Sequence, residues 1–241
     1  MMFKTMLKLE FKNIFRDPLY LFFVFFSVFI GLLGYFAIPY LQERVSTTSL
    51  LPEIIATILI LLTGYIFGAI TAFTLLDDLD DNVLLSLKIT PVSAKVYVSI
   101  KLIISYIFAF IATFFIIIAT DFLPTASLLT IIIVAILGAF QAPSIALIIT
   151  SFSDNKVEGF VTMKLSGILL AFPVLAFFIQ PWQELFISLA PGFWPARIIQ
   201  MVLIPQMSVN FNIATYFVIG GIYNLFFICL LLKIYFKRTN I

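Results

Sequence analysis

The chain has 241 residues, of which 63% are hydrophobic and 11% are charged. An ordinary soluble domain has roughly 45 to 50% apolar and about 25% charged residues, so much of the apolar surface must face lipid. With no histidine and one cysteine, the composition excludes an intrachain disulfide, a histidine general base and a zinc site of the usual kind. We expect no catalytic residue and no metal site, and we expect Cys229 to be a packed small hydrophobe.

Six continuous apolar runs predict six membrane-spanning helices. They cover residues 19–40, 54–76, 100–120, 126–150, 164–180 and 213–232. A helical span needs about 20 mostly apolar residues, and unbroken runs rich in Leu, Ile and Phe disfavour the alternating strands of a β-barrel. We therefore predict an all-α membrane protein in which residues 1–241 form a single transmembrane domain.

The positive charges predict the orientation of the spans. Of the 14 Lys and Arg residues, only Arg44 and Arg197 fall outside when the N-terminus is placed inside. Because cytoplasmic loops collect Lys and Arg, we expect a multi-pass protein of the plasma membrane with both termini in the cytoplasm.

Residues 1–17 are predicted to form an amphipathic interfacial helix. The charges recur every four residues at Lys4, Lys8, Lys12 and Arg16, beside an apolar stripe of Phe3, Leu7, Phe11 and Phe15. Residues four apart share a helix face, so the helix should lie on the inner membrane surface against anionic lipid headgroups. The alternative is that this segment is the frayed start of the first span.

The longest inner segment, residues 77–99, is predicted to be a cytoplasmic docking loop. Its candidate docking residues are Asp77, Asp78, Asp80, Asp81, Leu84, Leu85, Leu87, Thr90, Pro91 and Tyr97. A Pro disfavours helix at the residue before it, so we expect two short elements that meet at a corner. Apolar side chains in a cytoplasmic loop need a cover, either the membrane surface or a protein partner. A solvated acidic cap is the alternative.

The segment 181–210 is too apolar for a free loop, yet four prolines divide it into pieces too short to span. We predict an outer re-entrant helical hairpin before the last span, which forms part of an exit path or a packed lid.

Few polar residues lie within the predicted spans. Tyr65, Gln141 and Asn224 are candidates to line a path, although such residues more often join helices by hydrogen bonds. The Gly64 and Gly68 spacing lets two helices approach closely, at a subunit interface or elsewhere. None of the 12 acidic residues is clearly in mid-membrane, which disfavours an ion-coupled mechanism.

The basic N-terminal helix, the six spans and the inner sequence LLSLKITPVSAKVYVSIKL together resemble permease subunits of the type 2 ABC exporter superfamily. In that family the matching segment has an acidic pair, a Leu-rich turn, Thr-Pro, a Ser, a Tyr and a Lys. The similar places here are Asp77 to Asp81, Leu84 to Leu87, Thr90-Pro91, Ser93, Tyr97 and Lys101. The chain departs from the pattern in using Asp where Glu is common, and Asn82 stands near the place of a frequent Gly.

The resemblance implies a half-transporter that pairs with a second permease copy or a paralogue. Each half rests on a separate cytoplasmic ABC ATPase through the inner loop, which is the family's coupling helix. The N-terminal helix would be its connecting helix, and the segment 181–210 its re-entrant element.

Because the chain lacks the pattern G-x-x-x-x-G-K-[ST], we expect no cofactor and no enzyme activity on it, with ATP and Mg bound by the partner. The expected substrate is hydrophobic or amphipathic, such as a drug, a peptide or a lipid. Nucleic-acid binding has no support. The alternatives are an ion-coupled secondary transporter and a non-transporting sensor or immunity subunit.

Overall fold

The computed structural model describes residues 12, 16, 18–45, 49–87 and 93–239. Four of its spans are single long helices: α2 (Pro18–Arg44), α3 (Leu51–Asp80), α5 (Ala94–Thr120) and α12 (Ile213–Arg238). Two are broken: α6 (Leu128–Ala139) is followed by α7 (Gln141–Ser151), and α8 (Lys156–Ser166) is followed by η2 (Gly167–Leu170) and α9 (Ala171–Leu175). The short helices are α4 (Val83–Ser86), η3 (Pro181–Gln183), α10 (Glu184–Ile187) and α11 (Phe193–Leu203).

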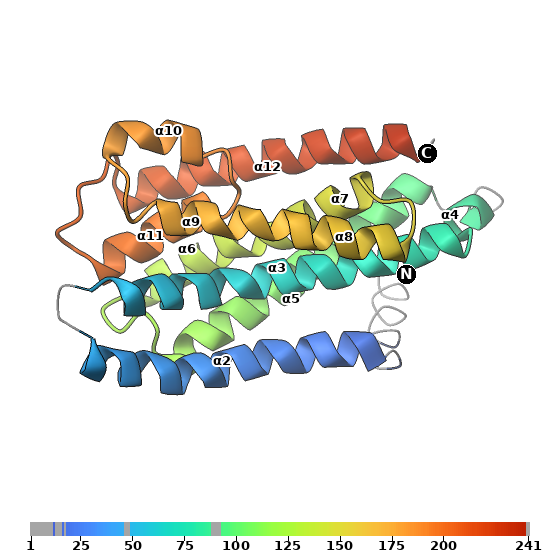
Figure 1. Cartoon of the computed structure of the whole chain (residues 1–241). Coiled ribbons are helices and arrows are strands. Elements are labelled where there is room, and N and C mark those ends of the chain that lie inside the picture. Colours follow the sequence, from blue (N-terminus) through green and yellow to red (C-terminus); the bar gives the residue numbers. More distant parts are fainter. Residues whose placement is uncertain (1–11, 13–15, 17, 46–48, 88–92, 240–241) are drawn as a thin grey trace.

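The described residues contain six helical segments long and apolar enough to cross a membrane, and no strand occurs among them. The predicted all-α membrane fold is therefore confirmed. Figure 1 shows the spans side by side, with α4 and the last turn of α12 at one end and α10 at the other. We name the end with α4 and the last turn of α12 the terminal end, and the end with α10 the far end.

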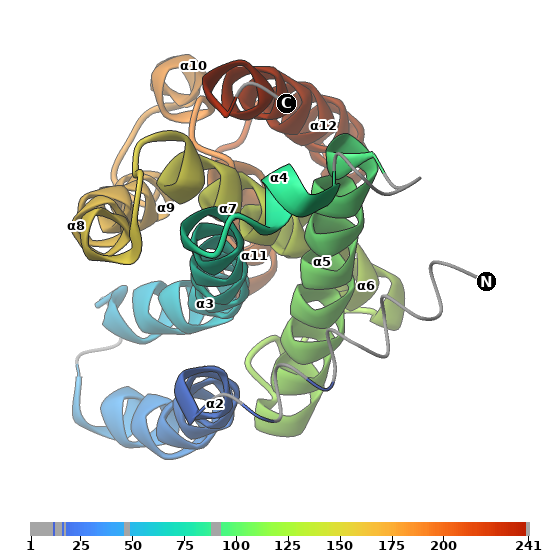
Figure 2. The same ribbon diagram turned by 90° about the vertical axis from the view of Figure 1, so that its right-hand side faces the viewer.

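The helices α3 and α6–α7 form the centre of the bundle. In each of these spans 67% of the most apolar stretch is buried, compared with 17 to 33% in the other four. Figure 2, viewed along the bundle, shows α3 and α7 surrounded by α2, α5, α8 and α12. The outer helices are covered on one side only, so their remaining apolar side chains are left for lipid. Cys229 of α12 is exposed on such a side, so the expectation that it is packed was wrong.

Two glycines allow α3 to pack closely on the α6–α7 span. A Cβ atom at Gly64 would lie 2.6 Å from the carbonyl oxygen of Gly138, and one at Gly68 would lie 2.7 Å from that of Ala142. A backbone oxygen cannot swing away as a flexible side chain can. The structure thus places this G-x-x-x-G spacing at a contact between two helices of the same chain.

The two broken spans differ from the predicted continuous runs. The fourth turns at Phe140, shortly before Pro143, whose ring nitrogen cannot donate to the carbonyl of Ala139. The fifth starts at Lys156 and not at residue 164. It is capped there, because Asn155 Oδ1 accepts the backbone N–H of Glu158 at 3.0 Å.

Candidate functional site

The segment predicted as a docking loop consists mostly of helix ends. Helix α3 continues through Asp80, so three of the four clustered aspartates lie on its last turns. Asn82 then has a φ of 55°, a left-handed conformation that Gly adopts freely and Asn tolerates. The short helix α4 follows, and α5 begins at Ala94. We name residues 77–87 and 93–101 the α3–α5 corner; Thr90 and Pro91 lie outside the described residues.

Two of the aspartates hold the α3–α5 corner against neighbouring helices. Asp78 Oδ2 accepts hydrogen bonds from Lys101 Nζ at 2.5 Å and from Tyr97 Oη at 3.1 Å, both on α5. Lys101 Nζ also lies 5.1 Å from the centre of the Tyr97 ring. Asp77 Oδ1 lies 2.5 Å from Lys156 Nζ at the start of α8. The acidic cluster therefore joins α3 to two other spans, while Asp80 and Asp81 are exposed.

The leucines of the α3–α5 corner differ in their surroundings. Leu84 is only 4% exposed and belongs to a core cluster with Leu76, Ala94 and Val98. Leu87 is partly buried against the same cluster, and the side chain of Leu85 lies outside the described part of the chain. Leu84 is thus covered by its own chain. The surface left for a partner contains Asp80, Asp81 and Ser86.

Most of the predicted interfacial helix lies outside the described residues, including Lys4, Lys8, Phe11 and Phe15. Lys12 and Arg16 are described, and both are helical and exposed.

The three candidate path residues are buried at separate contacts. Tyr65 Oη donates to the carbonyl oxygen of Met163 and lies 3.0 Å from Ser166 Oγ, so it joins α3 to α8. Asn224 Nδ2 donates to the Gly220 carbonyl at 2.8 Å in its own helix. The buried Gln141 Nε2 and Asn224 Oδ1 have no hydrogen-bond partner among the described residues.

The far end contains a buried ion pair that the sequence reasoning missed. Arg197 of α11 is fully buried and pairs with Glu184 of α10, which is 5% exposed. Arg197 also donates to the carbonyl oxygen of Ala176 and to Gln200 Oε1, both at 2.9 Å. Tyr216 Oη of α12 donates to Glu184 Oε2 at 2.7 Å.

This network joins the pieces of the segment 181–210 to each other and to α12. Buried charges are tolerated when they are paired and hydrogen-bonded, and here both partners are. The sequence signal for this network was the presence of Glu184, Arg197 and Gln200 in an otherwise apolar segment that prolines divide. Arg197 and Gln200 are three residues apart, so they share a helix face.

Comparison with known proteins places the chain among export permeases. The family described as "Fluoroquinolones export permease protein Rv2686c-like" matches residues 10–232. Two relatives from Mycobacterium tuberculosis strains, the fluoroquinolones export permease proteins Rv2686c and MT2760, are each 25% identical over 183 residues, which is 76% of this chain and 71% of the relative. No solved structure matches significantly. With its six spans and the resemblance carried by the α3–α5 corner, the chain is a permease subunit of the ABC exporter type, and it belongs to the Rv2686c-like family of export permeases.

Proposed function

We propose that this chain is the transmembrane subunit of an ATP-driven ABC exporter. It pairs with a second copy or a paralogue, and each half rests on a separate cytoplasmic ATPase that binds ATP and Mg. In this arrangement the terminal end faces the cytoplasm, the segment 1–17 lies on anionic lipid, and the far end faces outward. The sequence lacks the nucleotide-binding pattern, so in this proposal the energy of ATP reaches the chain through its contact with the ATPase.

The observation that carries the proposal is the bracing of the α3–α5 corner. The Asp78–Lys101 and Asp77–Lys156 pairs attach it to α5 and α8, while Asp80, Asp81 and Ser86 remain exposed. A surface that is firmly tied to several spans passes a displacement on to them, whereas a free loop would absorb it. ATP-driven closure of the partner then moves the corner, and the two permease halves rock about their interface.

The substrate we propose is a hydrophobic or amphipathic molecule. Fluoroquinolones are the first compounds to test, because the curated relatives are named for their export. Few charges lie in the spans, which favours such compounds over sugars or inorganic ions.

The test begins with purification of the tagged full-length chain, co-expressed with a candidate ABC ATPase encoded beside it. Asp80→Lys together with Asp81→Lys reverses two exposed charges on the α3–α5 corner. We expect this variant to recover less than about a tenth of the ATPase that the wild-type chain recovers, since reversed charges across an interface oppose docking. Leu84→Asp would not test docking alone, because Leu84 is buried in the core of this chain and a charge placed there would also destabilise the fold.

Glu43→Lys is the matched control, because Glu43 is an exposed acid on α2 near the far end. It should leave ATPase recovery unchanged.

Fluoroquinolone efflux driven by an ion gradient with no ATPase present would contradict the proposal and favour a secondary transporter. A chain that binds a ligand or an antimicrobial peptide but exports nothing would favour a sensor or immunity subunit.

A further inference from the structure

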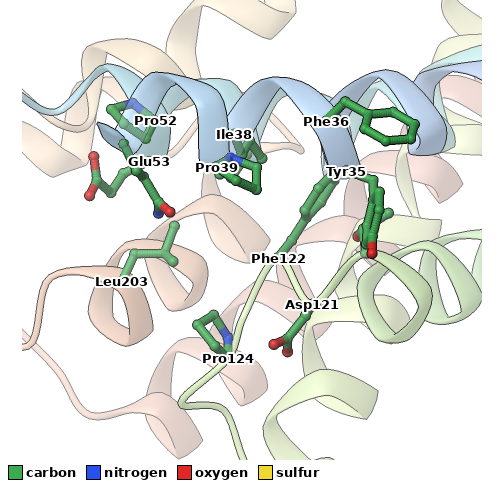
Figure 3. Close-up of a pocket in the computed structure, with 13 residues that line it drawn as sticks. Tyr35, Phe36, Ile38, Pro39, Pro52, Glu53, Asp121, Phe122, Pro124 and Leu203 are labelled. Atoms are coloured by element: carbon green, nitrogen blue, oxygen red, sulfur yellow. The ribbon is translucent and has the colours of Figure 1, made fainter. Parts of the chain in front are cut away.

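A cavity of about 580 Å³ lies at the far end between α2, the start of α3, the connection that follows α5 and the end of α11 (Figure 3). Its volume is in the range of roughly 300 to 1,000 Å³ that is usual for small-molecule sites. Tyr35 and Phe36 of α2, Glu53 of α3, and Asp121 and Phe122 of the connection line it. The cavity therefore combines aromatic rings with two carboxylates.

Local backbone features shape the side of the cavity that α2 and the connection after α5 form. Asp121 ends α5 with a φ of 50°, which turns the chain so that the next residue, Phe122, is buried. The ring of Phe122 fills the space beside Gly34 of α2, where a Cβ atom would lie 2.2 Å from Phe122 Cζ. Pro39 of α2 also lines the cavity, and it has no N–H to donate to the carbonyl of Tyr35. An acceptor oxygen is thus left without its helical donor beside the cavity.

The acidic side chains that line the cavity have no basic partner among the described residues. The lining contains Glu53 and Asp121 but no Lys or Arg among the described residues. Neither acid takes part in the ion pairs found in that part of the chain. Glu53 Oε2 is buried and has no hydrogen-bond partner there. Figure 3 shows the two carboxylates on opposite sides of the cavity.

These features suit one chemical class of ligand. A buried carboxylate oxygen without a partner is unfavourable, and a cation beside it would remove that penalty. Aromatic faces attract cations and also stack on other rings. An anion of the same shape would be repelled by both acids. A neutral apolar ligand would leave the Glu53 oxygen unsatisfied.

We propose that the far-end cavity binds the cationic aromatic part of an amphipathic substrate. This proposal rests on the proposed function, in which the far end faces outward and substrate leaves the protein there. It makes Glu53 and Asp121 the specificity residues, because they select the sign of the ligand's charge.

The test compares two ions of similar shape and opposite charge, tetraphenylphosphonium and tetraphenylborate. Their binding is measured on the purified full-length chain in detergent, without any ATPase. Wild type should bind the phosphonium ion more tightly than the borate. Glu53→Gln combined with Asp121→Asn should weaken phosphonium binding about tenfold, which corresponds to about 1.4 kcal/mol, and should not weaken borate binding.

The substitutions are chosen so that the protein folds. Asn tolerates the left-handed conformation of residue 121, and Gln at residue 53 keeps the size of the side chain. An unchanged midpoint of thermal unfolding checks this. Glu43→Gln removes an exposed acid of α2 that does not line the cavity, and it should leave both affinities unchanged.

Equal phosphonium affinity in wild type and the folded double variant would overturn the proposal, as would an equal loss of phosphonium and borate binding. Failure of the proposed function has a different signature. In that case no ATPase is recovered with the chain, while the binding difference between the two ions and its loss in the double variant persist.

Discussion

Lys101 Nζ of α5 lies 2.5 Å from Asp78 Oδ2 of α3, and the two side chains are only 4% and 14% exposed. The neighbouring pair, Asp77 with Lys156 of α8, has the same separation but side chains that are 30% and 44% exposed. Consecutive aspartates thus take part in one buried and one solvent-accessible ion pair. Solvent weakens the attraction between exposed charges and also stabilises each of them when they are separated. The two pairs should therefore respond very differently to the loss of a partner.

Replacement of Lys101 by Met should destabilise the protein by about 3 to 5 kcal/mol, because it leaves the Asp78 carboxylate buried without its cation. The measurement is chemical unfolding of the purified chain in detergent, followed by circular dichroism.

Lys156→Met is the matched control, since it removes a Lys from the exposed pair. It should cost about 0 to 1 kcal/mol. Similar losses for the two variants would mean that the Asp78–Lys101 pair is as hydrated as its neighbour.

The buried network at the far end should determine the order of the segment 181–210. Arg197→Met removes the cation beside Glu184 together with the donors to Ala176 and Gln200. We expect a loss of about 3 to 5 kcal/mol and faster amide hydrogen exchange, concentrated in residues 177–210.

Tyr216→Phe removes a single hydrogen bond to the same carboxylate, so it should cost about 1.5 to 3 kcal/mol. If exchange in Arg197→Met accelerates evenly over all spans, the network does not act locally and this interpretation is wrong.

Gly68→Ala should loosen the contact between α3 and α7. The added Cβ atom would meet the carbonyl oxygen of Ala142 at 2.7 Å and Ile145 Cβ at 2.8 Å. Overpacking of this kind costs about 1 to 3 kcal/mol, which thermal unfolding in detergent would detect.

Gly221→Ala offers a direct comparison, since a Cβ atom there meets nothing within 4 Å. In a helix, Ala is favoured over Gly by about 1 kcal/mol, so this variant should be as stable as wild type or more so. A Gly68→Ala protein that is equally stable would show that α3 and α7 separate easily.

The proposed orientation can be tested with single cysteines. In a Cys229→Ser background, Gln206→Cys places a thiol at an exposed position of the far end and Asp81→Cys places one at the terminal end. A membrane-impermeant maleimide applied to intact cells should label only the first, and permeabilised cells should show both. Labelling of Asp81→Cys in intact cells would reverse the orientation.

Continuous apolar runs made all six spans predictable, because a helix satisfies the backbone of such a run in lipid and the runs lack the alternation of barrel strands. The start of the fifth span was not predicted, since Asn155 and Glu158 cap a polar first turn that hydropathy ignores. The aspartate cluster was visible in the sequence, but its partners were not. Lys156 was interpreted only as a positive charge on the cytoplasmic side, and Lys101 only as such a charge and as the Lys of the family pattern.

The pairing of Glu184 with Arg197 was beyond sequence reasoning for a similar reason. The two residues belong to different short helices, and only the fold of the far end brings them together. The far-end cavity was not foreseen either, because its lining comes from four separate parts of the chain.

Helix α3 has 30 residues and its proline lies in the first turn, so it forms an unbroken rod of about 45 Å at 1.5 Å per residue. Glu53, which lines the far-end cavity, and Asp78, which braces the α3–α5 corner, are about 37 Å apart along this rod. A tilt of about 5° around its middle would shift each end by about 2 Å in opposite directions. A single tilt of α3 therefore changes both the width of the far-end cavity and the position of the α3–α5 corner.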